Sequence, residues 1–407
     1  MDPPTRQRGT YLLVLPWGLE AVGGVNRVVI SLYERLEASG ELQPRVLIPD
    51  WSAAGMVEAA AAGGIRTVRM RIRPVFADGS LPVELGKYAL RLPGEMRKIA
   101  ALVRRYDVRV VNCHYVSPHA LAWSLASALG VFPGTLIFSL HGLDIRTLAA
   151  QAGIRRGVWR RALAAAHAVV ACSQGLAEET KACFRLSGSN IVTIHNGVDA
   201  AQLRALATAR GTAAVAARGR PHILSLGTFE HKKGHDLLVR AFASVAREYP
   251  AAHLSILGRQ SSTLEPTRAL VRELRLESRV TLRVDAPHEE ALAALRESDV
   301  FVLPSRNEAF SVALLEAGAL ARAVVATEVC GVAELIENGR TGVLVPTESV
   351  HALADGMLRV LRDESQARRM GEALQRRVLA DFTAEATFAS YDRLVRERLT
   401  AAAGDAR

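Results

Sequence analysis

The stretch VFVLPSRNEAFSVALLE, residues Val300–Glu316, gives the clearest indication of the fold. Its first four residues are apolar and rich in valine, which predicts a buried strand. Pro304–Phe310 then form a polar loop, and Ser311 is a suitable N-cap for a helix that begins at Val312. A buried strand followed closely by a helix is typical of a parallel sheet covered by helices. We therefore expect a parallel α/β architecture around this segment.

The same alternation of short apolar runs and amphipathic stretches extends along the whole chain. The strand-like runs fall into two series of similar layout. The first series comprises residues 11–15, 45–48, 108–111, 136–140, 168–171 and 191–194, and the second comprises 222–226, 253–257, 280–284, 300–303, 324–326 and 342–345. These series predict an α/β protein with two Rossmann-like domains whose parallel sheets face a central cleft.

The boundary between the two domains is expected where composition and charge change. Residues 199–220 are rich in Ala, Thr and Arg, which predicts a linker. This places an N-terminal domain at 1–198 and a C-terminal domain at 221–383, with the helical segment 384–407 crossing back to the first domain. Up to residue 200 the chain contains 23 basic and 15 acidic residues, a net charge of +8, whereas the remainder carries +2.

The overall composition is that of a folded protein with a large core. Among 407 residues, 49% are hydrophobic and 23% are charged, which excludes a disordered or low-complexity chain. No His, Asp or Glu cluster has the spacing of metal ligands, and no metal is expected. The cysteines lie far apart without a CxxC pair, which argues against a zinc site or a disulfide scaffold and for reduced thiols. They are Cys113, Cys172, Cys183 and Cys330.

Neither a secretory signal nor a membrane-spanning helix is expected. Met1–Thr10 is polar and lacks an apolar signal region. Ala120–Leu140 contains no charged residue and is long enough to span a bilayer. Gly130 and Pro133 interrupt it, however, which predicts a buried helix, a turn and a strand. These features favour a cytoplasmic protein.

The start of the helix after Ser311 is suited to binding a phosphate. The first backbone N–H groups of a helix lack intrahelical acceptors, and the positive end of the helix dipole lies beside them. Glu308 precedes this helix and Glu316 lies in its second turn. An ionised carboxylate accepts hydrogen bonds from the hydroxyls of a sugar or ribose. Two solvated glutamates beside a helix are the alternative.

A second loop between a strand and a helix, Gly227–Gly234 (GTFEHKKG), carries two lysines. A lysine at the carboxyl edge of a parallel sheet can neutralise a leaving diphosphate without a metal. A solvated turn is again the alternative. The chain lacks GxGxxG after its first strand, and it lacks GxxxxGK[ST] and GxSxG. Nicotinamide dehydrogenases, P-loop NTPases and serine hydrolases are therefore disfavoured.

Taken together, these residues resemble the retaining glycosyltransferases of family four, which have the GT-B fold. The resemblance implies transfer of a sugar from a nucleotide-diphosphate sugar to a hydroxyl of a glycan or lipid-linked acceptor, without a cofactor. A sugar-nucleotide epimerase and a non-catalytic nucleotide-sugar-binding scaffold are the alternatives. The matching positions are Gly23-Gly24, His141–Asp144, His195–Asp199, Lys233-Gly234, Glu308 and Glu316 with Phe310 between them, Ala333–Leu335 and Thr341-Gly342.

The resemblance also implies roles for individual residues. His141 would face the transferred sugar, Lys233 would pair with the diphosphate, and Glu308 would hold the sugar hydroxyls. Asp144 would lie close to the acceptor, and Glu316 would bind the ribose. The nucleotide-sugar-binding residues would be Gly23, Gly24, Thr228, Lys232, Phe310, Ser311, Val312 and Glu316. His114, His119 and His288 are expected to be surface or packing histidines.

The chain departs from the family pattern at four positions. Thr228 stands where many members carry an arginine, and charge stabilisation would then depend on Lys233 and Lys232. Ala321 and Ala323 replace a usual Gly and Pro, and Cys330 replaces the first Gly of a pair. These departures leave the identity of the donor open.

The basic N-terminal half suggests an anionic membrane surface as a partner. Arg69, Arg71 and Arg73 alternate with apolar residues, which would place them on one strand face. Arg155 and Arg156 lie near Trp159, an arrangement suited to a bilayer interface. We therefore expect a peripheral protein at the inner face of the membrane. A nucleic-acid partner is disfavoured because only 5% of the residues are aromatic.

Overall fold

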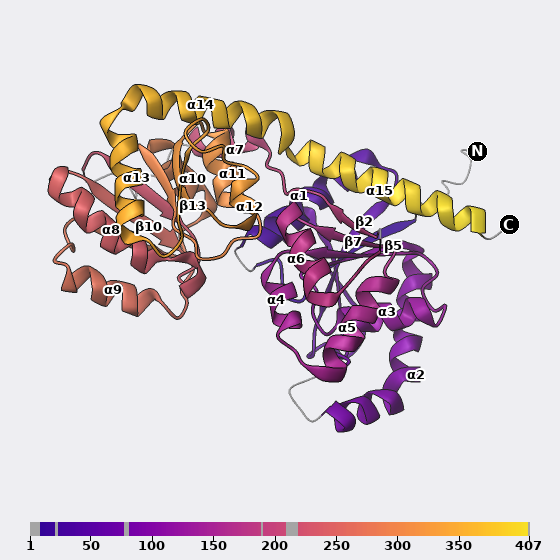
Figure 1. The fold of residues 1–407 in the computed structure, drawn as a ribbon. Helices are drawn as coiled ribbons and strands as arrows, with labels where there is room; N and C mark the ends of the chain where they lie inside the picture. The colour runs from indigo at the N-terminus through magenta and orange to yellow at the C-terminus, as the bar shows by residue number, and fades with distance from the viewer. Residues whose placement is uncertain (1–8, 21–22, 77–80, 189, 209–218, 406–407) are drawn as a thin grey trace. The chain divides into compact units, whose positions relative to one another are not determined.

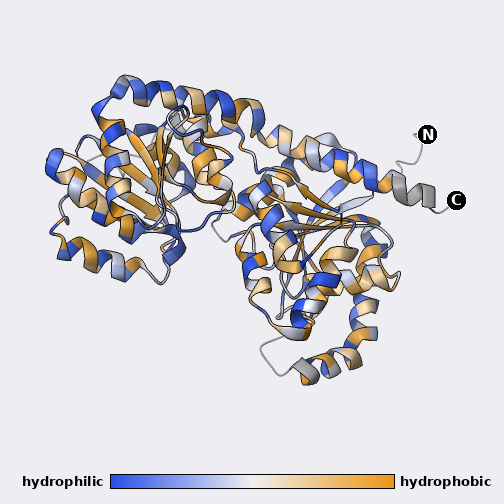
Figure 2. Ribbon diagram, viewed as in Figure 1, coloured by the Kyte–Doolittle hydropathy of each residue, from blue (hydrophilic) through white to orange (hydrophobic). Residues whose placement is uncertain are grey.

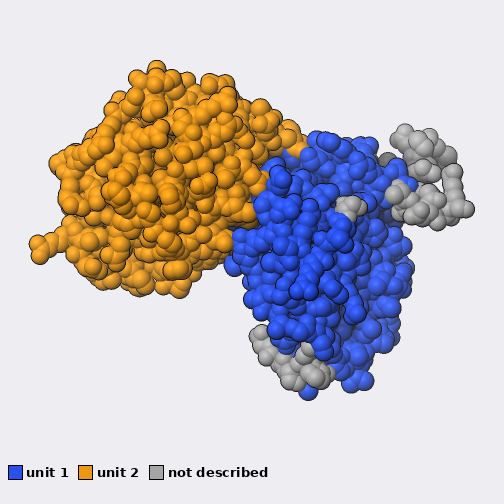
Figure 3. All heavy atoms as spheres, viewed as in Figure 1, with its two compact units in different colours: residues 1–195, 387–407 blue, residues 196–386 orange. Residues whose placement is uncertain are grey.

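The computed structural model describes residues 9–20, 23–76, 81–188, 190–208 and 219–405. The chain forms two compact units (Figure 3). Unit 1 consists of residues 1–195 and 387–407, and unit 2 consists of residues 196–386. Each unit contains a sheet with helices packed against it (Figure 1).

The described residues of unit 1 form an eight-stranded sheet in the order β3-β4-β2-β1-β5-β6-β7-β8. All strand pairs are parallel except β3 with β4. The inner strands are buried and rich in Val, Leu and Ile, as expected for a parallel sheet covered on both faces. The strands are β1 Thr10–Val14, β2 Gln43–Pro49, β3 Val57–Ala60, β4 Arg66–Met70, β5 Val108–His114, β6 Thr135–Leu140, β7 Ala168–Ala171 and β8 Ile191–Thr193.

The long C-terminal helix α15 completes the core of unit 1. Tyr391, Leu394 and Val395 of α15 join one apolar cluster with α1 and the strands β1, β2, β5, β6 and β7. The helices of unit 1 are α1 Gly24–Ser39, the 3-10 helix η1 Ala62–Gly64, α2 Leu81–Tyr106, α3 Ala120–Ala128, α4 Leu143–Ala149, α5 Gly153–Ala165 and α6 Gln174–Phe184, and α15 spans Ala384–Asp405.

The described residues of unit 2 form a six-stranded, all-parallel sheet in the order β11-β10-β9-β12-β13-β14. Its strands form a band of apolar residues (Figure 2). They are β9 His222–Leu226, β10 His253–Gly258, β11 Val280–Val284, β12 Val300–Leu303, β13 Ala323–Thr327 and β14 Val343–Val345. The helices are α7 Ala200–Thr208, the 3-10 helix η3 His231–Lys233, α8 His235–Glu248, α9 Leu264–Glu273, α10 His288–Glu297, α11 Val312–Ala319, α12 Cys330–Ala333, α13 Val350–Arg362 and α14 Glu364–Asp381.

The structure confirms the predicted α/β class and the two series of strands. The uncharged segment 120–140 is α3 followed by β6, as expected. In the described part of the chain, no helix is both long and apolar enough to cross a bilayer. None of the four cysteines forms a disulfide. The segment expected to be a linker differs, because its residues 200–208 form helix α7, which packs against α10 in unit 2.

Two expectations for the basic surface are wrong. Trp159 is fully buried in unit 1 at 0% exposure and cannot insert into a bilayer interface. Strand β4 ends at Met70, so Arg71 and Arg73 lie beyond it and do not share a strand face with Arg69. Arg71 and Arg73 instead lie beside Trp51, with their guanidinium carbons 5.9 and 5.4 Å from the centre of its ring.

Candidate active site

In unit 2, two neighbouring parallel strands bring the predicted lysine and glutamate together. Strand β9 leads into the loop that carries Lys233, and its neighbour β12 leads into the loop that carries Glu308. The carboxyl ends of parallel strands meet at one edge of a sheet, which explains why these loops touch. The Lys233 Nζ lies 2.5 Å from the Glu308 Oε2, and both side chains are less than one fifth exposed. The Ser305 hydroxyl approaches the same oxygen at 3.4 Å.

Arg306 fixes these two loops to one another. Its backbone N–H donates to the carbonyl of Lys232 at 2.8 Å. Its guanidinium donates to the carbonyl of His231 at 2.9 Å and to both carboxylate oxygens of Asp236 at 2.7 and 2.8 Å. The hydrogen bonds from Arg306 hold the pKa of Asp236 below its usual range. Both partners therefore stay charged at neutral pH, and the loop of Glu308 is tied to the start of α8.

A glycine is required where these loops cross. Gly234 has φ +65°, in the left-handed region, and a Cβ there would lie 2.1 Å from the carbonyl oxygen of Pro304. A second close approach supports the same loop from α12, because a Cβ at Gly331 would lie 1.7 Å from the carbonyl oxygen of Ala309. The backbone of the loop is therefore held from two sides by residues without side chains.

The start of α11 matches the predicted anion-binding geometry. The Ser311 side chain accepts a hydrogen bond from the Leu314 N–H, which confirms Ser311 as the N-cap. Helix geometry leaves the N–H groups of Val312 and Ala313 without intrahelical acceptors. The Phe310 ring is buried and packs 5.5 Å from the ring of Phe382. Any contribution of Phe310 to a ligand would therefore come from its backbone.

Glu316 is buried on α11, and a histidine holds its carboxylate. The His288 Nε2 lies 3.0 Å from the Glu316 Oε1. Glu316 is 4% exposed, whereas the His288 side chain is 29% exposed. The sequence suggested only a packing or surface role for His288. Nothing in the spacing along the chain links these residues, because His288 begins α10 and Glu316 lies on α11.

The other residues of this loop that were predicted to bind the nucleotide sugar are Lys232 and Thr228. The Lys232 Nζ lies 2.8 Å from the Glu230 Oε2, so its charge is paired away from Glu308. Thr228 is partly exposed in the same loop, and its carbonyl accepts a hydrogen bond from the Glu230 N–H. Of the two lysines, Lys233 is the one placed at the Glu308 carboxylate.

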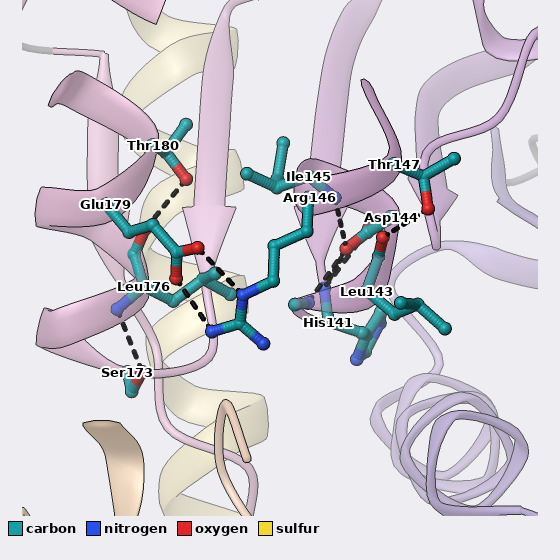
Figure 4. Close-up of polar contacts among 11 residues, drawn as sticks. His141, Leu143, Asp144, Ile145, Arg146, Thr147, Ser173, Leu176, Glu179 and Thr180 are labelled. Atoms are coloured by element: carbon teal, nitrogen blue, oxygen red, sulfur yellow. Dashed lines mark hydrogen bonds and ion pairs between the residues drawn. The ribbon is translucent and has the colours of Figure 1, made fainter. Parts of the chain in front are cut away.

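In unit 1, Asp144 organises the loops that follow β5 and β6. Its carboxylate accepts backbone N–H groups of His141, Gly142, Ile145 and Val116 at 2.8–3.1 Å. Asp144 is 2% exposed. Burial raises its pKa to about 6, against the lowering effect of these four donors. This geometry gives Asp144 the role of fixing the turn that carries His141 (Figure 4), and its proximity to the acceptor stays a prediction.

The same turn is joined to helix α6. Arg146, two residues after Asp144, donates to both carboxylate oxygens of Glu179 at 2.8 Å (Figure 4). Such bidentate pairs fix geometry as well as adding energy. Helix α4 is therefore held by the Asp144 turn at its start and by α6 along its length.

His141 lies directly after β6, beside a second histidine. The His114 Nδ1 lies 3.2 Å from the His141 Nε2, and the two rings are stacked with 5.5 Å between their centres. Burial lowers the pKa of His141 to about 4, and burial together with His141 lowers the pKa of His114 well below its usual range. Both rings are therefore neutral at pH 7.

Asn26 of α1 contacts residues 17–19, which follow β1. Its side chain accepts from the Trp17 Nε1 at 2.7 Å and donates to the carbonyls of Gly18 and Leu19. Gly24 begins α1, and a Cβ at Gly23 would meet no described atom within 4 Å. This open position is compatible with the predicted approach of a ligand. Within the described ranges, no three His, Cys, Asp or Glu side chains are grouped as metal ligands.

Comparison with known proteins identifies the family. A family model described as Glycosyltransferase Family 4 matches residues 22–202, and one described as Glycosyl transferases group 1 matches residues 213–377. D-inositol 3-phosphate glycosyltransferase of Kineococcus radiotolerans is 30% identical, over 96% of this chain and 95% of that protein. The chain belongs to glycosyltransferase family 4. The epimerase and scaffold alternatives are not favoured by these matches.

Other relatives of this glycosyltransferase agree with that result. N-acetyl-alpha-D-glucosaminyl L-malate synthase of Bacillus anthracis is 27% identical over 75% of this chain and 78% of that protein. Among solved structures, sucrose-phosphate synthase of Thermosynechococcus elongatus has a TM-score of 0.76 at 24% identity, covering 97% of this chain and 100% of that one. Anabaena HepE in complex with UDP has a TM-score of 0.73 at 16% identity, covering 95% and 100%. These likenesses confirm the GT-B fold.

Proposed function

We propose that this glycosyltransferase binds the diphosphate of a nucleotide sugar on unit 2, between Lys233 and the start of α11. The observation that carries the proposal is the partly buried Lys233–Glu308 pair, which places a cation and a carboxylate at the edge of the sheet. The N–H groups of Val312 and Ala313, which lack intrahelical acceptors, would supply further donors for the phosphate oxygens. His288 orients Glu316, whose carboxylate would accept hydrogen bonds from the ribose hydroxyls.

The reaction we propose needs neither a metal nor a cofactor. The bond between the anomeric carbon of the sugar and the diphosphate oxygen breaks, and a bond from that carbon to the acceptor oxygen forms on the same face. The proton of the acceptor hydroxyl passes to a diphosphate oxygen, which keeps the charges balanced. Lys233 and the N–H groups of α11 stabilise the negative charge that develops on the diphosphate. The configuration of the sugar is retained.

Glu308 and Lys233 would change partners when the donor binds. The ammonium of Lys233 would pair with the diphosphate, and the carboxylate of Glu308 would then accept hydrogen bonds from the hydroxyls of the sugar. His141 of unit 1 would face the transferred sugar. The distance of 2.5 Å between the Lys233 Nζ and the Glu308 Oε2 fits a site in which the two side chains are already in place before the donor binds.

The donor class is proposed from the relatives. HepE is crystallised with UDP and with UDP-glucose, which supports a nucleotide-diphosphate hexose as the donor. A thermal-shift panel of UDP-, GDP-, ADP- and TDP-sugars tests this, because a specific ligand raises the melting temperature of the state it binds. We expect one donor to raise the melting temperature. We also expect that donor to release its nucleoside diphosphate when a hydroxyl acceptor is added. Donor conversion without any acceptor would contradict transfer.

Membrane association of unit 1 remains a separate proposal. We propose contact with anionic lipid through a Trp51 surface made of Trp51, Arg69, Arg71 and Arg73, with Arg155 and Arg156 on α5 as further basic residues. Trp51 is 50% exposed, and its carbonyl accepts a hydrogen bond from Arg71 at 2.9 Å. Each well-placed cation is worth about 1 kcal/mol near such a surface. The acceptor would then be lipid-linked or a glycan precursor.

Liposome flotation at low salt tests the membrane proposal. The double variant Arg71→Gln, Arg73→Gln should bind anionic vesicles several-fold less tightly than the parent protein. Arg368→Gln is a matched control, because its side chain is also highly exposed and lies on α14 in unit 2. Equal binding to neutral and anionic vesicles would contradict the proposal.

A further inference from the structure

Two adjacent strands of unit 1 place a pair of histidines where they end. His114 is the last residue of β5, and His141 follows the last residue of the neighbouring β6. At 3.2 Å, the His114 Nδ1 and the His141 Nε2 share one hydrogen bond. One of these two nitrogens carries the proton and the other accepts it, since both rings are neutral. The direction of this bond decides which nitrogen of His141 is protonated.

The surroundings of His114 favour one direction. His114 is 1% exposed, and its Nε2 has no hydrogen-bond partner among the described residues. If the His114 Nδ1 accepted the shared proton, then Nε2 would have to be a buried N–H group without an acceptor. If Nδ1 donates, then Nε2 is only a lone pair without a donor. Orphaned buried N–H groups are rarer in proteins than under-satisfied acceptors.

The nearest polar group on α15 does not change this assignment. The Tyr391 ring lies 6.3 Å from the ring of His114, but its hydroxyl lies 2.9 Å from the Ser139 Oγ. Ser139 donates its one proton to the Asn112 Oδ1 at 2.7 Å. The Tyr391 hydroxyl is therefore the donor to Ser139, and no described acceptor lies within hydrogen-bond distance of the His114 Nε2.

We propose that His114 donates its Nδ1–H to the His141 Nε2 and thereby fixes His141 as the tautomer protonated at Nδ1. His141 then presents an N–H donor to an oxygen of the bound sugar, and His114 acts as its positioning residue. Asp144 supports this arrangement, because it accepts the backbone N–H of His141 and holds the turn in place. The part of the inference that concerns the sugar rests on the proposed function, whereas the tautomer does not.

Nitrogen-15 NMR of the full chain labelled at histidine tests the tautomer directly. We expect His141, assigned by its loss in His141→Gln, to show a protonated Nδ1 and an unprotonated Nε2 at pH 7. We expect His114, assigned through His114→Asn, also to be protonated at Nδ1. A protonated Nε2 on His141 would overturn the proposal, whatever the activity of the enzyme.

Matched variants of His114 test its positioning role. His114→Asn keeps a donor close to the position of Nδ1, whereas His114→Phe keeps the ring shape without any donor. We expect His114→Phe to lower kcat at least tenfold, with binding of the nucleoside diphosphate unchanged, and His114→Asn to recover most of the loss. Equal activity of the two variants would overturn the positioning role. If His141→Gln kept full activity, the role of His141 in transfer would fail while the NMR result still decided the tautomer.

Discussion

Lys233 and Glu308 form a mostly buried ion pair with 2.5 Å between Nζ and Oε2, although 75 residues separate them along the chain. The pair exists because β9 and β12 are neighbours in the sheet and because Arg306 and Gly234 hold the following loops in contact. Each charge satisfies the other without a ligand. In the proposed reaction, a diphosphate would replace Glu308 as the partner of Lys233, and the sugar would replace Lys233 as the partner of Glu308.

Lys233→Ala should lower kcat by about two orders of magnitude. Loss of one preorganised donor costs about 3 kcal/mol of transition-state stabilisation, and Lys233 is the cation nearest Glu308. Lys181→Ala is the control, because it removes a partly exposed lysine on α6 that pairs with Glu178. Steady-state kinetics of both variants provide the measurement. A turnover number for Lys233→Ala equal to that of the control would refute the role.

His288→Ala should weaken binding of the nucleoside diphosphate about tenfold while changing kcat little. The histidine orients a buried carboxylate proposed to hold the ribose, and a hydrogen bond to a charged group contributes about 1.5 kcal/mol or more. Isothermal titration calorimetry gives the affinity directly. His351→Ala is the control, since that histidine is 90% exposed on α13. Unchanged affinity in His288→Ala would show that Glu316 does not depend on His288.

His235 should make unit 2 less stable in mild acid. Burial lowers its pKa to about 3, whereas histidine in an unfolded chain titrates near 6.5. Below about pH 6.5, His235 is protonated in the unfolded state but stays neutral in the folded state. The free energy of unfolding therefore falls as the pH drops below about 6.5. Between pH 7 and pH 5 this one group accounts for about 2 kcal/mol.

Denaturant unfolding of the parent protein and of His235→Leu at both pH values measures this effect. The difference in unfolding free energy between the two proteins should decrease by about 2 kcal/mol on going from pH 7 to pH 5. A difference that does not vary with pH would mean that His235 titrates normally in the folded state.

Gly234→Ala should destabilise unit 2 and abolish most activity together. Its φ of +65° costs an L-residue about 1–2 kcal/mol, and the added Cβ would collide with the backbone of Pro304. Gly157→Ala is the control, because Gly157 lies inside α5 with nothing within 4 Å of its missing Cβ. Alanine there should stabilise by about 0.5–1 kcal/mol. Thermal unfolding measures the change in stability of each variant, and a transfer assay measures its activity.

Most of the fold could be predicted from the sequence because most strands are short apolar runs, whereas β3 (VEAA) and β4 (RTVRM) are less apolar and lay outside the two predicted series. The N-cap at Ser311 was also predictable, since it depends on neighbouring residues alone. The contacts of His288, Arg306 and His114 could not be predicted, because each joins residues from different elements. Trp159 was misjudged for a related reason: four arginines beside it in the chain suggested an interface, whereas the face of α5 on which it lies is packed inward.

The C-terminal helix imposes an order on biosynthesis. Tyr391, Leu394 and Val395 belong to the core of unit 1, although nearly two hundred residues of unit 2 are translated before them. At about 5–20 residues per second, a ribosome needs on the order of ten seconds or more to add that stretch. During that time the core of unit 1 lacks these three apolar side chains, and a nascent chain stalled before residue 391 would expose the apolar surface that they contact.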